Sequence, residues 1–346
     1  MPTTAFDTFF ACTILVAAAL IATAFFTSNM QIRIDNTEDL NKNSYLNAIA
    51  DHIIASPGTP TAWGTSTSLP EDFGLAQAQS TTPYELDPDK VSRLNSQNNA
   101  SLTHTQIAVA AKLDNLAFGV SVSPLMTISI AQTENHTAGS NTVFTFAAST
   151  VVNSKPTDTT LHAYVLANNY FANSTESLPS GVGYFSVEVP SVDTDKALLV
   201  VFARASFDDR VASYAVYSFA DSAQQSTPCN TVVSLSALDY NLTVTPNMPD
   251  ITLQKGYLLA YNYQSNLTAS ASNPSPFPKA IDKSPFVIVV CGHSGVEYFQ
   301  EWTAYPQVPL MAGSSFEGSE KTIFSYLVTV KGSLYKLELS FGGLPA

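Results

Sequence analysis

One interval of the sequence, residues 3–56, contains neither glycine nor proline. These two residues together occupy roughly one position in eight of an average chain, and both interrupt helices, so their absence over this length predicts a continuous helix. At a rise of about 1.5 Å per residue, such a helix would extend on the order of 80 Å. We expect it to end at Ser56-Pro57-Gly58, because proline removes a backbone donor and glycine permits the turn.

The two halves of this predicted helix differ in chemistry. Phe9–Phe26 carries no charged residue over a length close to that needed to cross a hydrocarbon core, and we expect the apolar half to occupy residues 5–30. The second half, residues 31–56, is polar with an apolar stripe at helical spacing. The stripe consists of Leu46, Ile49, Ile53 and Ile54. One face of the second half is therefore expected to lie against a folded body.

The apolar half is rich in small side chains, which allow helices to approach each other closely. The candidate helix-packing residues are Ala11, Ala17, Ala18, Ala22 and Thr23. A plain membrane anchor is the alternative, since alanine is common in any membrane span. No lysine or arginine precedes Arg33, so the basic region of a secretory signal peptide is missing and we expect the segment to be retained.

The sequence contains opposing signals for the orientation of this segment in a membrane. Arg33 and Lys42 flank its C-terminal side, which by the positive-inside rule would place the following domain in the cytoplasm. Acidic residues lie among them, and the rest of the chain is rich in Ser, Thr and Asn, as extracellular proteins often are. We expect the large domain to lie outside the cell.

Composition also limits the partners. Charged residues form 12% of the chain and the formal net charge is −13. Nucleic-acid binding needs clustered Lys and Arg to neutralise phosphates, whereas only 15 such residues are spread over the sequence. No nucleic-acid partner is expected.

Two covalent modifications are compatible with an extracellular location. Cys229 and Cys291 form a candidate disulfide, the alternative being two unrelated buried thiols. Five Asn-X-Ser/Thr sequons are candidate N-glycosylation sites, at Asn99, Asn135, Asn173, Asn241 and Asn266. A chain this rich in Asn, Ser and Thr would produce about this many by chance. Asn135, Asn173 and Asn266 fall between predicted strands, where a glycan could be carried.

From about residue 100 the hydrophobic period changes from 3.6 to 2, which predicts strands. The predicted strands are 118–130, 143–151, 162–166, 184–189, 197–204, 211–219, 232–242, 257–263, 286–291, 297–305, 323–330 and 334–341. Lys331-Gly332 predicts a hairpin between the last two. Short and evenly spaced strands without a long helical pattern favour a β-sandwich.

We therefore predict an α+β fold with three parts. The long hydrophobic N-terminal helix (1–56) is followed by a proline-containing connector (57–99), which has a short helix near residues 89–94 and packs through Trp63 and Phe73. Residues 100–346 form a predominantly β region, either one sandwich or two immunoglobulin-like lobes divided near 221–228.

One segment resembles a catalytic motif. Residues 286–295 (FVIVVCGHSG) are similar to the nucleophile elbow of α/β-hydrolases, but that pattern needs glycine two positions after Ser294, where Val296 stands. His293 is the last histidine, whereas the triad histidine of those enzymes follows the serine. A strand end with a glycine turn explains the segment better, and no catalytic residue is predicted.

Metal and cofactor sites are not predicted either. The five histidines, His52, His104, His136, His162 and His293, lack the spacing of zinc ligands. The acidic pairs Asp87/Asp89, Asp193/Asp195 and Asp208/Asp209 lack the ligand series of a calcium-binding loop, so we predict solvated turns. No phosphate loop or dinucleotide motif occurs.

The N-terminal region resembles a known family. The helix pattern, together with Asn47–Asp51 (NAIAD), Ser56–Gly64 (SPGTPTAWG), Phe73–Ala76 (FGLA) and Tyr84–Val91 (YELDPDKV), resembles archaeal type IV pilin-like, membrane-anchored surface proteins. The resemblance covers roughly residues 5–95, and it implies export, membrane retention of the apolar helix and extraction into a filament with a core of such helices. Asp7 would correspond to the acidic residue that pilins carry near the start of this helix.

The sequence departs from the family pattern because no basic leader with a processing site precedes the helix. Either the true start lies elsewhere, or processing differs, or the chain is an anchored relative that does not polymerise. We predict a non-enzymatic structural subunit of an archaeal extracellular filament at the cell surface. Its partners would be copies of itself through the N-terminal helix, the membrane before assembly, and glycans. The alternative is a single-pass, membrane-anchored β ectodomain that acts in adhesion or as an accessory subunit of a cell-envelope complex.

Overall fold

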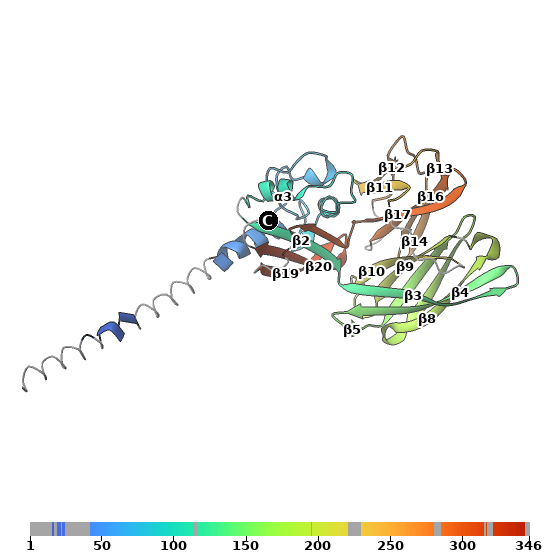
Figure 1. Cartoon of the computed structure of the whole chain (residues 1–346), viewed down its shortest axis with the longest axis horizontal. Coiled ribbons are helices and arrows are strands. Elements are labelled where there is room, and N and C mark those ends of the chain that lie inside the picture. The colour runs from blue at the N-terminus through green and yellow to red at the C-terminus, as the bar shows by residue number, and fades with distance from the viewer. Residues whose placement is uncertain are drawn as a thin grey trace, which may run out of the picture. The chain divides into compact units, whose positions relative to one another are not determined.

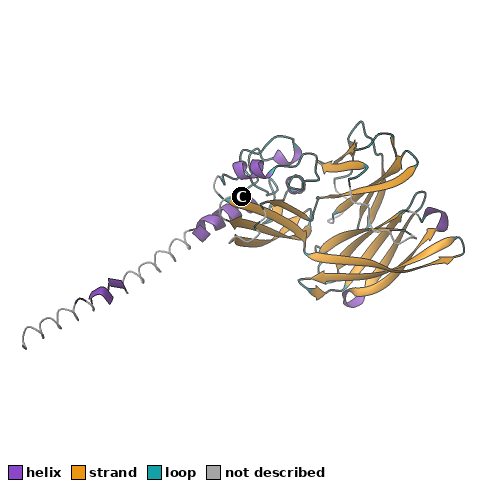
Figure 2. Ribbon diagram, in the orientation of Figure 1, coloured by secondary structure: helices purple, strands orange, loops and turns teal. Residues whose placement is uncertain are grey.

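The computed structural model describes residues 16, 19–21, 23–24, 42–113, 116–194, 196–220, 230–279, 285–314, 316 and 321–342. The chain divides into two compact units, Met1–Asp51 and His52–Ala346. The structure is mostly β, with 54% strand and 14% helix, arranged in several sheets (Figure 1 and Figure 2).

The predicted α+β class with a long apolar N-terminal helix is wrong. Within the described part of the chain, no helix is long and apolar enough to span a bilayer. The described positions between 16 and 24 are helical, yet Val16, Leu20 and Ile21 are 60%, 66% and 71% exposed. Most helix stability in proteins comes from burying an apolar face, and the exposure of these side chains shows no such burial.

Residues 42–55 form a helix whose apolar stripe is confirmed. The four predicted stripe residues are buried or half-buried, whereas Lys42, Asn47 and Asp51 are exposed. The side chain of Asn47 donates to Asp51 Oδ2 over 3.0 Å, one turn further along. The helix ends at residue 55, and Gly58 then adopts a left-handed φ of +70°. A Cβ at Gly58 would lie 2.5 Å from Asp72 O, so glycine is required there for space as well as for backbone conformation.

The connector contains short elements and a buried aromatic pair. Its elements are η1 (Trp63–Thr65), β1 (Glu85–Leu86) and α2 (Pro88–Ser92). A further helix, α3 (His104–Ala110), follows it at the start of the region predicted to be β. Thr103 starts α3 with a capping box, in which its side chain accepts from Gln106 N and Gln106 Oε1 accepts from Thr103 N. Trp63 and Phe73 are fully buried with ring centroids 5.8 Å apart, as predicted for a packed connector.

The connector lies against sheet 1, which has the strand order β1-β19-β20-β2-β18. Its other strands are β2 (Ala117–Pro124), β18 (Leu310–Gly313), β19 (Lys321–Val330) and β20 (Ser333–Gly342). Phe118 links the two, since its ring centroid is 6.4 Å from Phe73 and 5.2 Å from Phe341. The predicted hairpin at Lys331-Gly332 is confirmed, and both residues have positive φ.

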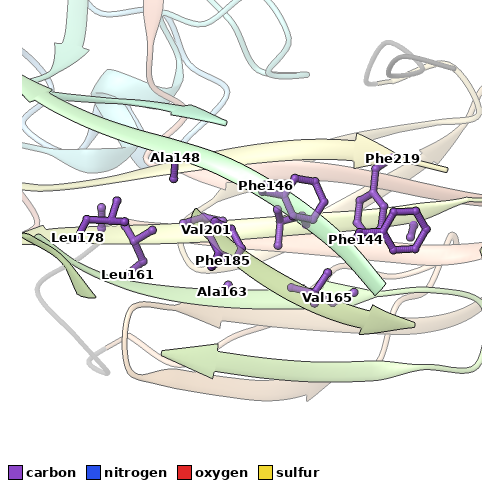
Figure 3. Close-up of a cluster of buried hydrophobic side chains, with 14 of the residues drawn as sticks. Phe144, Phe146, Ala148, Leu161, Ala163, Val165, Leu178, Phe185, Val201 and Phe219 are labelled. Carbon is purple, nitrogen blue, oxygen red and sulfur yellow. The ribbon is translucent and has the colours of Figure 1, made fainter. Parts of the chain in front are cut away.

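Sheets 2 and 3 enclose the first sandwich core. Sheet 2 consists of β3 (Met126–Ala138), β4 (Asn141–Val152), β5 (Lys155–Pro156) and β8 (Val182–Pro190). Sheet 3 has the order β10-β9-β6-β7, with β6 (Thr159–Leu166), β7 (Phe171–Leu178), β9 (Ala197–Ala205) and β10 (Ala212–Phe219). The short helices η2 (Pro179–Gly181) and η3 (Ser191–Asp193) flank β8. Phe144 and Phe146 of β4 point into the core beside Phe185, Val201 and Phe219 (Figure 3).

Sheets 4 and 5 enclose the second sandwich core. Sheet 4 has the order β14-β13-β16-β17, with β13 (Ile251–Ala260), β14 (Tyr263–Leu267), β16 (Phe286–Ser294) and β17 (Glu297–Tyr305). Sheet 5 consists of β11 (Val233–Leu238), β12 (Asn241–Pro246) and β15 (Ser275–Pro276). Phe286, Ile288 and Val290 of β16 pack into this core.

Sheets 3 and 4 also pack on each other through their outer faces. Alternate residues of β9 and β16 form this third apolar layer, among them Val200, Phe202, Val287 and Val289, all at most 1% exposed. Tyr164 crosses the layer and donates its hydroxyl to Ala260 O over 2.8 Å. Because both faces of β9 and β16 are buried, their sequences are continuous apolar runs rather than alternating ones.

Strand predictions are confirmed where the apolar pattern is strong and wrong where turns are tight or strands are polar. The predicted strand 118–130 is two strands, β2 and β3, and 232–242 is a hairpin that turns at Asp239 and Tyr240 with positive φ. The predicted strand 257–263 spans the turn between β13 and β14. The polar strand β7 was not predicted, because Phe171–Leu178 shows no apolar alternation.

Candidate functional site

The segment that resembles a nucleophile elbow is a β-hairpin. β16 ends at Ser294, Gly295 turns with φ +60°, and β17 starts at Glu297, which pairs with Ser294. The elbow needs a turn from strand to helix, which this segment does not form. Val296, at the tip, is 95% exposed. The prediction of a strand end with a glycine turn is confirmed.

Buried charged side chains instead gather around α2. We call this cluster the α2 junction, and it consists of Asp87, Asp89, Lys90 and Arg93 with Trp63 and Tyr305. The local sequence favours a helix start, because Asp87 accepts at Oδ1 from Asp89 N and Lys90 N, at 2.9 and 3.2 Å, and Pro88 occupies the first helical position. This start places Asp89, Lys90 and Arg93 on the buried side of the connector.

Lys90 holds two separate parts of the connector together. Its Nζ donates to Pro57 O and Ala76 O, both over 2.8 Å, and lies 4.0 Å from Asp87 Oδ2. The side chain is fully buried. Desolvation lowers the pKa of Lys90, and the nearby charge of Asp87 opposes this shift. Pro57 is the second residue after the helix 42–55, so Lys90 fixes the point at which the chain enters the connector.

Arg93 plays a similar part and also lies beside Trp63. Its Nε donates to Ala100 O over 2.8 Å, and its Nη1 donates to Ser68 O over 3.0 Å and to Trp63 O. The guanidinium carbon lies 5.5 Å from the Trp63 ring centroid, within the range of a cation–π contact. Backbone carbonyl oxygens of three separate residues, two in the connector and one just after it, thus bind one buried guanidinium group.

Asp89 connects the connector to the second sandwich. Its Oδ1 accepts from Asp239 N over 2.8 Å and from the Tyr305 hydroxyl over 3.0 Å. Desolvation raises the pKa of Asp89 to about 6, and the charge of Asp87 adds to the rise, whereas the hydrogen bonds from Asp239 and Tyr305 oppose it. Tyr305 is fully buried, and burial raises its pKa so that it stays a hydroxyl donor.

The geometry of the α2 junction fits attachment rather than catalysis. The cationic groups donate to backbone carbonyl oxygens, which take no part in proton transfer. The prediction that Asp87 and Asp89 lie in a solvated turn is wrong, since they are 8% and 4% exposed. Over the ranges that the structure describes, no group of three or more His, Cys, Asp or Glu residues could hold a metal ion.

A depression of about 360 Å³ lies beside the connector. It is lined by Ile54, Ala55, Ala76, Gln77, Ser80, Thr81, Thr82, Pro83, Tyr84 and Glu85. Glu85 is the only carboxylate in this lining, and it accepts a hydrogen bond from the Ser80 hydroxyl. The described residues that line this depression therefore do not supply the pair of carboxylates that such general acid–base catalysis would use.

The remaining predicted site residues are only partly placed. Ala11, Ala17, Ala18 and Ala22 lie outside the described residues, while the Thr23 hydroxyl donates within its own helical segment to Ala19 O and Leu20 O. Cys291 is buried, and desolvation raises the pKa of its thiol to about 11. Cys229 lies outside the described residues, so the disulfide stays a prediction.

The sequon asparagines are all described. Asn135, Asn173 and Asn266 lie on strands β3, β7 and β14 and are exposed, so the expectation that they fall between strands is wrong. Asn99 is exposed in the connector and donates to Thr245 Oγ1 over 3.2 Å. Asn241 is half-buried at the start of β12 and donates to Asp239 O over 2.8 Å.

No protein-family model matches the chain, and no curated protein matches its sequence. The α2 junction was not predicted from the sequence. The N-cap aspartate and proline of α2 do indicate a short helix, but the partners of Lys90 and Arg93 are backbone carbonyl oxygens, which no residue type reveals.

Proposed function

We propose that this chain is a non-enzymatic structural subunit of an archaeal extracellular filament of the type IV pilin-like kind. Its apolar N-terminal segment joins copies of the chain, and the β-rich unit forms the outer surface. The resemblance of residues 5–95 to pilin-like surface proteins supports this proposal. In this function the N-terminal segment carries the load of the filament, and the rest of each subunit must stay attached to it.

The proposal rests on one observation, namely that buried charged side chains of the α2 junction bind segments that are far apart in the sequence. Lys90 binds Pro57, two residues after the helix 42–55, and Asp89 binds the second sandwich through Asp239 and Tyr305. Burying charged groups costs free energy unless each is paired, and here the pairing serves to join segments far apart in the sequence. Such a joint suits a subunit that transmits force from its N-terminal segment to its surface.

The test is a pair of substitutions in the apolar segment. Ala18→Leu and Ala22→Leu add bulk without charge, so they keep the segment apolar while preventing close approach between copies. We expect filaments to disappear from sheared cell-surface material, while the protein remains in the membrane fraction. Val16→Leu, a substitution of one large apolar residue by another, is the control and should leave filaments intact. If the alanine variants still form filaments, close packing of this segment is not the basis of assembly.

A further inference from the structure

The three sequons that lie on strands share a position in their sheets. Asn135 is on β3, Asn173 on β7 and Asn266 on β14. Among the described residues, each of these strands is hydrogen-bonded to one neighbour only, namely β4, β6 and β13. All three are therefore edge strands of sheets 2, 3 and 4.

These edges carry few of the features that protect an edge from pairing with another strand, although the register of β3 shifts between Gln132 and Glu134, as at a β-bulge. An edge strand presents unpaired N–H and C=O groups, and proteins commonly block such edges with lysine, proline or a covering element. β3, β7 and β14 contain no proline and no lysine, and their only charged side chains are Glu134 and Glu176. On β3, every residue from Thr133 to Ala138 is exposed. β3 lies beside β10 and β7 beside β8, but neither pair is hydrogen-bonded as neighbouring strands of one sheet.

The sequons on these edges are accessible for modification. The side chains of Asn135, Asn173 and Asn266 are exposed, and so are the threonines that complete the sequons, Thr137, Thr175 and Thr268. Asn173 Nδ2 donates to Gln264 Oε1 over 3.1 Å, and Gln264 is itself exposed. A glycosylated asparagine retains one hydrogen on Nδ2, so this bond can persist after modification.

We propose that Asn135, Asn173 and Asn266 carry N-linked oligosaccharides that block edge-to-edge pairing between β-rich units. The donor is an oligosaccharide on a lipid phosphate carrier. Its anomeric carbon leaves the carrier, which keeps the bonding electron pair as phosphate, and bonds to Nδ2, while one amide proton passes to a base of the transferring enzyme. The inference rests on the export that the proposed function requires. Asn99, in the connector, and the half-buried Asn241 are not part of it.

Mass spectrometry of peptides from the full chain, purified from cells of its source, tests the attachment. We expect a sugar mass on each of the three peptides. Thr137→Ala, Thr175→Ala and Thr268→Ala each remove one sequon while retaining its asparagine, so each should lose the sugar from its own peptide alone. Thr127→Ala is the matched control, because Thr127 is an exposed threonine on β3 outside any sequon. Unmodified asparagines at the three positions in the wild-type protein would overturn the proposal.

Light scattering of the purified chain tests the shielding. The variant that lacks all three threonines should form larger particles than the wild type or Thr127→Ala at equal concentration. A triple variant that loses its sugars and stays as dispersed as the wild type would overturn the shielding role. Filaments built from unmodified chains would refute the glycan proposal and leave the proposed function intact. Glycosylated chains that form no filaments would support the glycan proposal and contradict the proposed function.

Discussion

One short stretch of the connector buries three charged side chains, those of Asp89, Lys90 and Arg93. Each of them binds a different set of partners. The two cations donate to backbone carbonyl oxygens, whereas the carboxylate accepts from a backbone N–H and a tyrosine hydroxyl. In the sequence these residues look like ordinary surface charges, since charged side chains are rarely fully buried. Their burial depends on tertiary partners up to 216 positions away, as for Asp89 and Tyr305.

The raised pKa of Asp89 predicts a pH dependence of stability. Because the folded-state pKa of Asp89 is about 6 and the ordinary pKa of an aspartate is 3.8, the unfolded chain ionises first as pH rises. The carboxyl therefore lowers the free energy of unfolding between about pH 4 and 6, by about 3 kcal/mol in total. Asp89→Asn keeps an oxygen acceptor for Asp239 N and Tyr305 but does not ionise. We expect this variant to match or exceed the wild type in stability at pH 7 and to lose the advantage below pH 4.

Denaturant titration of both proteins across this pH range provides the measurement, and the difference between them isolates Asp89 from the other carboxylates. Asp193→Asn, in the short helix η3, is the control for a general loss of charge and should show no such difference. Parallel pH curves for the wild type and Asp89→Asn would mean that Asp89 is solvated rather than buried.

At the scale of elements, a strand can be predicted from the sequence where its burial produces a continuous apolar run or an apolar alternation. β9 and β16 are apolar throughout because each is covered on both faces, and 197–204 and 286–291 were predicted within one to three residues of their true ends. β7 and β14 are half-exposed edges rich in Asn, Ser and Gln, so neither alternation nor β-branched side chains indicate a strand. The sequons on these edges were placed between strands for the same reason.

The packing of sheet 3 on sheet 4 predicts a strong effect of cavity formation at β16. Val289 is fully buried in this layer, so Val289→Ala should lower the free energy of unfolding by about 2–3 kcal/mol. Val296→Ala makes the same chemical change at the exposed tip of the adjoining hairpin and should cost less than about 0.5 kcal/mol. Equal effects of the two substitutions in denaturant titrations would contradict the packing of the two sheets.

At the scale of the whole molecule, the sequence predicted a β-rich region correctly but overstated the helical part. The interval without glycine or proline favours a helix at each position, yet propensity alone does not stabilise a long apolar helix without burial. Residues 42–55 are helical and have a buried stripe, whereas Val16, Leu20 and Ile21 are helical but exposed. In the proposed filament, other copies of the chain would supply that burial.

Electron microscopy of material sheared from cells, combined with mass spectrometry of its N-terminal peptide, tests the central claim most directly. The proposed function predicts regular filaments that contain this chain, including the apolar Phe9–Phe26. If the chain instead stays with detergent-extracted membranes and no filament contains it, the claim is contradicted, and a membrane-anchored β ectodomain becomes the better explanation.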